Sequence, residues 1–546
     1  MKIALAQLNY HIGNFEANTN KIIKTLEEQK TKGVDLVVFA ELSICGYPPR
    51  DFLEYPEFID HCEAAAQKVA AASVGIACII GLPKLNPVLE GKDLYNVAYF
   101  IEDGKVKQTV KKALLPTYDV FDEYRYFEPA HEFKCVDFKG YKIALTVCED
   151  LWNLGDNPLY KACPMDELIK EEPDLMINIA ASPFAYNHDE ERIFVLSQNC
   201  HKYNLPLFYV NHVGAQTELI FDGGSLVFDK AGDIVHEFKY FEEDVQVFDV
   251  EQIKRSIVLN KNQVRQTHTE QVYQALILGI KDYFEKSGFT KATLGLSGGI
   301  DSAVVCALAC EALGAENVMA VLMPSKYSSD HSIKDAEDLV EKLGCKSTII
   351  PIKDVADAFE NTLNPEFKDL PANITEENIQ ARSRGVILMA MSNKFGYILL
   401  NTSNKSESAV GYGTLYGDMC GAISVIGDCY KTQVYQLAEY INRQREIIPV
   451  NSIVKPPSAE LRPGQKDSDS LPDYDILDKI LFEYIELKKS LKNIVALGYD
   501  ESLVKRILKM VNQAEFKRYQ TPPTLRVSPK AFGMGRRMPI VGKYLS

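Results

Sequence analysis

The stretch LGLSGGIDS, residues 294–302, decides the fold of the second half of the chain. It follows a short apolar segment that reads as a strand, and it opens the apolar run AVVCALACEAL at 303–313, which reads as a helix. Gly298 and Gly299 permit a tight turn in which backbone N–H groups converge, and the helix N-terminus adds positive potential. The stretch therefore predicts an anion site suited to phosphate. The G-x-x-x-x-G-K-[ST] spacing of a Walker A loop is absent.

Around this stretch, strands and helices alternate along the chain. The segments VMAVLMPS, STIIPI and YILLNTSN are short apolar strand candidates separated by helical stretches. Such alternation predicts a doubly wound parallel sheet. The stretch KPPSAELRPGQKDSDSLPDY at 455–474 is rich in Pro, Ser and Asp and predicts a mobile loop.

The S-G-G-x-D-S string in this strand–turn–helix setting resembles the pyrophosphate loop of the ATP pyrophosphatase superfamily, whose fold is adenine nucleotide alpha hydrolase-like. A glycine pair alone is more often a simple helix cap, so the whole string carries the resemblance. Enzymes of this kind adenylate a carboxylate or carbonyl oxygen and release pyrophosphate. The resemblance implies that ATP is bound by Gly295, Leu296, Ser297, Gly298, Gly299, Ile300, Asp301 and Ser302.

A second motif, NTSNKSE at 401–407, narrows the resemblance. Together with PSKYSS at 324–329, ENIQARSRG at 377–385 and FKRYQTPP at 516–523, it is similar to the NAD synthetases. The resemblance implies that Thr402 binds ATP, that Asn378, Glu407 and Lys517 bind deamido-NAD, and that Asp301 and Glu407 hold Mg²⁺. Two positions depart from the pattern: Ser468 stands where an acidic residue is expected, and Tyr519 where an Arg is expected.

The first half has its own constellation. Glu41, Lys112 and Cys148 each stand at or just after the end of an apolar strand candidate. A thiol nucleophile needs a base and a positive neighbour, and a thioester needs stabilisation of its tetrahedral precursors. A carboxylate, an ammonium group and a thiol supply these roles. D-G at 103–104 and Gly232 each sit between alternating segments and predict hairpins.

The strings around these residues, A-E-L followed by G-Y, K-x-x-L-P and V-C-E-D, are similar to the nitrilase superfamily. That resemblance makes Glu41 the general base, Lys112 the oxyanion stabiliser and Cys148 the nucleophile that attacks a glutamine amide. It also points to a glutamine-binding set of Tyr118, Glu123, Ser182 and His188. The family often has a basic residue six places after the serine, so His188 or Arg192 could take that role, and the sequence leaves the choice open.

Taken together, the chain is expected to be α/β with two domains. Residues 1–250 predict a nitrilase-like α-β-β-α sandwich, 251–270 a connector, and 271–546 the doubly wound parallel-sheet domain. The two resemblances imply one reaction: ammonia released from L-glutamine amidates deamido-NAD, with ATP and Mg²⁺ required. An ammonia tunnel and a homo-oligomer are implied by the resemblance alone.

Composition excludes several other classes. A formal charge of −15 without a long basic run argues against nucleic acid as a partner. No apolar run approaches about 18 residues, so no membrane span is expected. Twelve cysteines without a C-x-x-C pair, and no secretory leader, predict a cytoplasmic chain without a disulfide framework.

Four alternative functions remain open from the sequence. They are an amidotransferase with another acceptor, a tRNA-modifying pyrophosphate-loop protein, a non-catalytic scaffold, and an ammonia-only synthetase with an idle first domain.

Overall fold

The computed structural model describes residues 1–154, 159–255, 266–368 and 370–544. The chain divides into two compact units, Met1–Gln266 and Thr267–Ser546, and each is described by itself. Of the expected connector, residues 256–265 lie outside the described part, and the helix α6 begins within its last residues, at His268.

The first unit is built on two six-stranded sheets. The strand order of one is β14-β1-β2-β3-β4-β5 and that of the other is β13-β12-β9-β8-β7-β6. In each sheet three strands run parallel in the middle, β1-β2-β3 and β7-β8-β9, and antiparallel strands flank them. The strands are β1 (Lys2–Gln7), β2 (Leu36–Phe39), β3 (Ala77–Leu85), β4 (Leu94–Glu102), β5 (Lys105–Lys111), β6 (Val136–Phe138), β7 (Tyr141–Val147), β8 (Leu175–Ile179), β9 (Leu207–Val210), β12 (Leu226–Phe228), β13 (Ile234–Glu237) and β14 (Asp244–Asp249), with a separate antiparallel pair, β10 (Val213–Gln216) and β11 (Leu219–Asp222).

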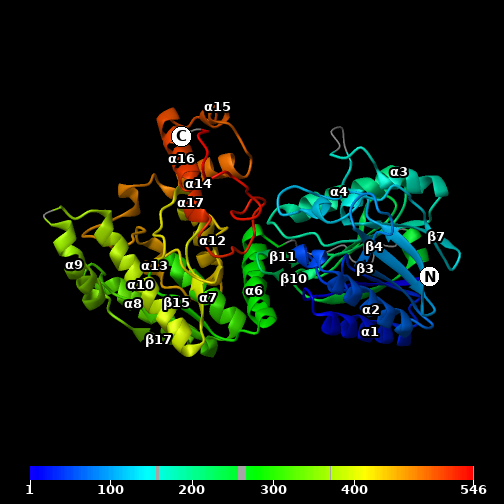
Figure 1. Ribbon diagram of the computed structural model, residues 1–546, viewed down its shortest axis with the longest axis horizontal. Helices are drawn as coiled ribbons and strands as arrows, with labels where there is room; N and C mark the ends of the chain where they lie inside the picture. The colour runs from blue at the N-terminus through cyan, green and yellow to red at the C-terminus, as the bar shows by residue number, and fades with distance from the viewer. Residues whose placement is uncertain (155–158, 256–265, 369, 545–546) are drawn as a thin grey trace. The chain divides into compact units, whose positions relative to one another are not determined.

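Alternation along the strands produces the layers of this unit. Successive residues of a strand point to opposite faces, so Ile3 and Leu5 of β1 pack with β8 residues such as Ile177 between the sheets, whereas Ala4 and Ala6 face the helices. The long helices α1 (Phe15–Thr31) and α2 (Pro56–Ala72) cover the first sheet, and α3 (Pro164–Leu168) and α4 (His188–Tyr203) lie on the side of the second (Figure 1). The expected α-β-β-α sandwich is confirmed. The remaining short helices are η1 (Arg50–Glu54), η2 (Glu123–Arg125), η3 (Cys148–Leu151), η4 (Ile169–Glu171) and α5 (Val250–Lys254).

Both expected hairpins are present. β4 and β5 pair antiparallel around a turn in which Asp103 and Gly104 have φ of 46° and 75°. β12 and β13 pair antiparallel around Gly232, whose φ is 76°. Asp and Gly tolerate the left-handed region that such turns need, so the turn residues identified the hairpins correctly.

The second unit contains one five-stranded sheet in which all the strands are parallel. The strand order is β17-β16-β15-β18-β19. The order reverses between β15 and β18, and ligands of open parallel sheets bind outside the carboxyl ends of the strands at such a switch point. The doubly wound parallel sheet is confirmed. Its strands are β15 (Ala292–Gly295), β16 (Val318–Leu322), β17 (Lys346–Ile349), β18 (Ile398–Asn401) and β19 (Ile423–Ser424).

Helices surround this sheet (Figure 1). A separate apolar cluster joins α11, α14 and α16. The segment 455–473 carries one short 3-10 helix and otherwise irregular backbone, and α14 begins at residue 474. In the part of the chain that the structure describes, no helix is both long and apolar enough to cross a membrane. The helices are α6 (His268–Ser287), α7 (Ile300–Leu313), η5 (Ala315–Asn317), α8 (Asp330–Leu343), α9 (Lys353–Phe367), α10 (Ile374–Phe395), α11 (Lys405–Val410), α12 (Lys431–Ile441), α13 (Val450–Val454), η6 (Asp467–Asp469), α14 (Tyr474–Ile485), α15 (Leu491–Val495), α16 (Glu501–Gln513) and α17 (Glu515–Arg518).

Candidate functional sites

In the first unit, Glu41, Lys112 and Glu123 form one buried ion-pair group. Lys112 follows β5, and its Nζ lies 2.7 Å from Glu41 Oε1 and 2.9 Å from Glu123 Oε1. Asn96 donates from Nδ2 to the same Glu41 oxygen at 2.7 Å. Among the described residues, the other oxygen of Glu41, Oε2, is buried without a hydrogen-bond partner. One oxygen of Glu41 is therefore occupied by its two neighbours, and the other is available to accept a proton.

Cys148 stands at the end of β7 with φ of +45°, a left-handed conformation that is uncommon for a non-glycine residue. The Asp150 carboxylate holds this turn to the chain that follows Lys112. Its oxygens accept backbone N–H groups of Ala113 at 3.0 Å, Leu114 at 2.9 Å and Val147 at 3.0 Å. The ends of β5 and β7, which come from different sheets, are thereby joined, and the lysine and the cysteine are held on one side of the unit.

The charges of this group act on the Cys148 thiol. Burial raises the pKa of Cys148 well above its usual value, and the Glu41 carboxylate raises it further while Lys112 lowers it. Burial raises the pKa of Glu123 to about 7, although Lys112 opposes that shift. The thiol is therefore protonated at rest, and a nucleophilic attack by Cys148 requires a base.

Of the expected glutamine-binding residues, Glu123 belongs to the ion-pair group, and the other three lie in two further polar groups. In one, Tyr118 and Tyr160 donate their hydroxyls to Glu149 Oε1 at 2.9 Å and 3.1 Å. Glu149 directly follows Cys148, so this group lies beside the thiol.

In the other group, Ser182 Oγ lies 3.1 Å from His188 Nε2, and the His188 ring stacks on Trp152 with ring centroids 5.2 Å apart. Arg192 does not join them. Its side chain is buried, and its Nη1 and Nη2 donate to the two oxygens of Asp222 at 3.0 Å and 2.7 Å.

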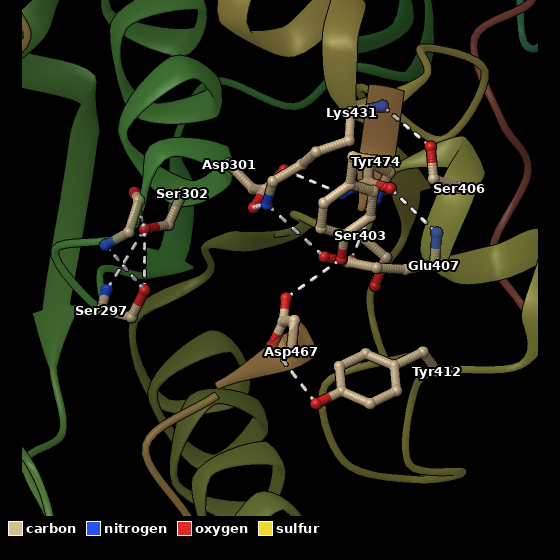
Figure 2. Close-up of polar contacts among 12 residues, drawn as sticks. Ser297, Asp301, Ser302, Ser403, Ser406, Glu407, Tyr412, Lys431, Asp467 and Tyr474 are labelled. Atoms are coloured by element: carbon tan, nitrogen blue, oxygen red, sulfur yellow. Dashed lines mark hydrogen bonds and ion pairs between the residues drawn. The ribbon is translucent and has the colours of Figure 1, made fainter. Parts of the chain in front are cut away.

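In the second unit, the 294–302 stretch forms a compact turn between β15 and α7. Ser297 Oγ and Ser302 Oγ are 3.2 Å apart, and Gly299 N donates to Ser297 Oγ at 3.2 Å (Figure 2). Gly298 has φ of 80°, and a Cβ at this position would lie 2.1 Å from the Ser332 carbonyl oxygen. Only glycine fits there, because both the conformation and the space exclude a side chain.

Asp301 and Glu407 converge on the Lys431 ammonium group, as Figure 2 shows. Lys431 Nζ is 2.5 Å from Asp301 Oδ2 and 3.7 Å from Glu407 Oε1. Asn404 also donates from Nδ2 to Asp301 Oδ1 at 2.9 Å. Burial and the neighbouring Asp301 charge raise the pKa of Glu407 to about 8, although Lys431 lowers it. Two carboxylates this close, with a cation between them, are a donor set that suits a hard divalent ion such as Mg²⁺.

These residues border a cavity of about 890 Å³. Asn378 Oδ1 accepts the Thr414 hydroxyl at 2.8 Å, and Lys517 Nζ donates to the carbonyls of Gly411 and Gly413 at 2.8 Å and 2.7 Å. Burial lowers the pKa of Lys517. The expected residues that line this cavity are Gly295, Leu296, Ser297, Gly299, Ile300, Asp301, Asn378, Thr402, Glu407 and Lys517.

Some expected residues do not line the cavity. Gly298 and Ser302 support the turn from behind, through the close approach to Ser332 and the bond to Ser297. Ser468 is exposed, and the preceding residue, Asp467, is buried and faces the cavity. Tyr519 is 63% exposed and is also outside the lining.

Several residues that border these sites were not predicted from the sequence. Glu149 and Asp150 belong to the V-C-E-D string, but the sequence alone does not show which groups hydrogen-bond to their carboxylates. Asp467 accepts the hydroxyls of Tyr412 at 3.2 Å and Tyr474 at 3.0 Å (Figure 2). Other missed residues are Asn96 and Tyr160 in the first unit and Lys431, Arg382, Arg384, Lys455 and Arg462 around the cavity.

Together, fold and site geometry define a two-unit α/β protein in which an α-β-β-α unit carries a buried Glu–Lys–Cys group and a parallel-sheet unit carries a glycine turn at the edge of a cavity. Comparison with known families agrees with this division: residues 2–255 match the carbon-nitrogen hydrolase family and residues 272–521 match the NAD synthase family.

Whole-length relatives carry both units. A glutamine-dependent NAD(+) synthetase of Synechocystis sp. is 45% identical over 98% of both chains, and one of Thermotoga maritima is 40% identical over 100% of this chain and 99% of its own. The structure of the Acinetobacter baumannii glutamine-dependent NAD⁺ synthetase in complex with ADP is similar with a TM-score of 0.78 and 38% identity, covering 99% of this chain and 98% of that one. The chain belongs to the glutamine-dependent NAD(+) synthetase family.

Proposed function

We propose that this chain amidates deamido-NAD to NAD, using ATP and the ammonia that it releases from L-glutamine. The observation that carries the proposal is that relatives with this activity in their names match both units over nearly their whole length. The two sites support it chemically, since one holds a thiol, a base and a buried cation, and the other holds a phosphate turn beside paired carboxylates.

In the first site, the free Oε2 of Glu41 takes the proton of Cys148 as the sulfur attacks the glutamine side-chain carbonyl. Lys112 stabilises the tetrahedral oxyanion, and Glu123 fixes the lysine. The C–N bond then breaks, the proton passes to the leaving nitrogen, and ammonia leaves a γ-glutamyl thioester. Water attacks the thioester with its proton going to Glu41. The C–S bond breaks, glutamate departs, and the proton returns to the sulfur.

Recognition of glutamine falls to the polar groups beside the thiol. The Glu149 carboxylate, held by Tyr118, suits the α-ammonium group of the substrate. Ser182 and His188 suit its α-carboxylate. Arg192 is excluded from that role in this proposal because its guanidinium is engaged with Asp222.

In the second site, the turn at 295–302 and the N-terminus of α7 hold the ATP phosphates. A nicotinate carboxylate oxygen of deamido-NAD attacks the α-phosphorus, and the bond to pyrophosphate breaks. Ammonia then attacks the adenylated carbonyl, AMP leaves, and the nitrogen loses a proton. Lys431 and the lining arginines offset the charge of the phosphates. Asn378 and Lys517 are assigned to the dinucleotide, and Thr402 to ATP.

The paired carboxylates of Asp301 and Glu407 fit Mg²⁺, which when bound would neutralise phosphate oxygens. The presence of Lys431 between them indicates that this position favours positive charge. As parts of the same proposal, ammonia passes between the sites within a homo-oligomer, and the reaction takes place in the cytoplasm. All twelve cysteines are free thiols, which suits a reducing compartment.

The test is NAD formation from deamido-NAD and MgATP, with glutamine or ammonium as nitrogen source. The native chain should use both, whereas Cys148→Ala should lose the glutamine reaction by at least about 1,000-fold and keep the ammonium reaction. Cys163→Ala, a cysteine of the same unit outside the site, is the matched control. If the native chain forms no NAD from either source, the proposed acceptor is wrong.

A further inference from the structure

Three cysteines meet in the second unit at a place that the proposed reaction does not use. Cys306 and Cys310 are four residues apart on α7, and Cys345 stands between the end of α8 and the start of β17. Their Sγ atoms all lie within 4.8 Å of one another. No other group of three or more metal-ligating side chains this close occurs in the residues that the structure describes.

The local structure explains why these thiols converge. Residues four apart on a helix lie on the same face, so Cys306 and Cys310 are stacked one turn apart. Gly344, with φ of 71°, caps α8 and turns the chain toward β17, and α8 packs against α7 (Figure 1). The turn delivers Cys345 to the cysteine face of α7. A C-x₃-C spacing is not a familiar metal motif, so the third thiol is visible only in the fold.

The cluster is separate from the nucleotide cavity. None of its three cysteines lines that cavity. The cavity borders the carboxyl end of β15, whereas Cys345 precedes the amino end of β17, and the strands are parallel. The cysteines therefore lie toward the amino-terminal ends of the strands, opposite the cavity. They can be altered without touching a residue assigned to ATP or deamido-NAD.

We propose that Cys306, Cys310 and Cys345 form a binding site for a single thiophilic divalent cation of the Zn²⁺ type. Three sulfur ligands select soft or borderline ions over Mg²⁺. Sulfur atoms around one zinc ion lie about 3.8 Å apart, since each Zn–S bond is about 2.3 Å and the geometry is tetrahedral. The observed spacing is compatible with that arrangement.

Burial favours the divalent ion over a monovalent one. Cys306 is fully buried, and Cys310 and Cys345 are each 8% exposed. Three thiolates with Zn²⁺ leave one net negative charge, whereas three thiolates with a monovalent ion such as Cu⁺ leave two, and buried net charge is costly. Cys310 and Cys345 retain this slight exposure, and we assign the fourth position of the tetrahedron to water. Binding releases the thiol protons to solvent.

The experiment uses the full-length chain, reduced and freed of metal, and titrates it with Co²⁺ as a spectroscopic probe before displacement by Zn²⁺. The native chain should bind about one ion and show the thiolate-to-cobalt absorption in the near ultraviolet, which Zn²⁺ abolishes. Cys345→Ala should lower Zn²⁺ affinity by more than about 100-fold. Cys429→Ala, which removes another buried cysteine of the same unit, should leave binding unchanged.

A second variant guards against loss of folding. Cys345→His keeps a ligand of another type, so it should still bind Co²⁺ with a weaker thiolate band. Circular dichroism and NAD formation from ammonium report whether each variant is folded. A native chain without the thiolate band, or a Cys345→Ala chain that is folded and keeps it, would overturn the proposal.

Discussion

The pair Arg192 and Asp222 allows a prediction that separates a structural residue from a binding residue. Arg192→Met preserves much of the buried side-chain volume but leaves the Asp222 carboxylate without its cation. Removing one partner of a buried pair costs about 3–5 kcal/mol. In a unit of this size, 1 kcal/mol shifts the melting temperature by roughly 2–4 °C. The first unit should therefore melt about 6–20 °C lower.

The single tryptophan makes this measurement selective. Trp152 belongs to the first unit, so its fluorescence follows the unfolding of that unit alone. Replacing both partners, Arg192→Met with Asp222→Leu, should recover part of the loss because no buried charge is left unpaired. His188→Ala provides the contrast: it should raise the glutamine KM by about 10–100-fold through the lost contact with Ser182. The melting temperature should fall by less than about 6 °C, because the stacking on Trp152 contributes only about 0.5–1.5 kcal/mol.

The reasoning fails if the effects are exchanged. A folded Arg192→Met chain that melts normally but has a raised glutamine KM would make Arg192 the clamp and its pairing with Asp222 incidental. His188→Lys supplies a further check, since a cation at this position should restore much of the affinity that His188→Ala loses.

Three other predictions concern the second unit. Gly298→Ala should weaken MgATP binding by at least about tenfold, because the new Cβ would lie 2.1 Å from the Ser332 carbonyl oxygen. Gly344 is the control position, since its φ is similar but a Cβ there would have no atom within 4 Å. Equal losses of ATP binding in Gly298→Ala and Gly344→Ala would contradict the role of the close approach. The pKa of Glu407 in the folded chain is raised to about 8, so the free energy of unfolding in Mg²⁺-free buffer should fall as pH rises from 5 to 8. Over that range the unfolding free energy of Glu407→Gln should increase relative to that of the native chain by at most about 1.4 kcal/mol per pH unit. A difference between the two chains in urea unfolding that does not change with pH would show that this carboxyl does not titrate in that range. The Mg²⁺ affinity, measured by calorimetry, should rise over the same interval as the proton leaves Glu407, and an affinity that is flat with pH would count against Glu407 as a ligand.

Most elements of the fold could be predicted from short stretches of the sequence. Hairpin turns and strand–helix alternation depend on neighbouring residues, so they identified both sheet types and the D-G turn at 103–104. The phosphate turn was also readable, because its glycine requirement and its strand–turn–helix setting fall within nine residues. The strand order of the second unit was not readable: β15 lies beside β18, although more than 100 residues separate them. That pairing brings Asp301 and Glu407 to one cavity.

What the sequence could not supply were partners that act at a distance. Lys431 begins a helix 130 residues after Asp301, and nothing in its own string distinguishes it from a solvated lysine. Arg192 illustrates the opposite case. Its position near Ser182 along the chain made it a candidate for binding the glutamine carboxylate, but in the structure its guanidinium pairs with Asp222. In both cases the missing information is which opposite charge each cation neutralises. A buried cation whose partner lies outside the site is held in place, as Arg192 is by Asp222, whereas a cation whose partners are themselves site residues can act on a substrate. The same criterion separates Lys112, held between two carboxylates beside a thiol, from the many lysines of similar local sequence.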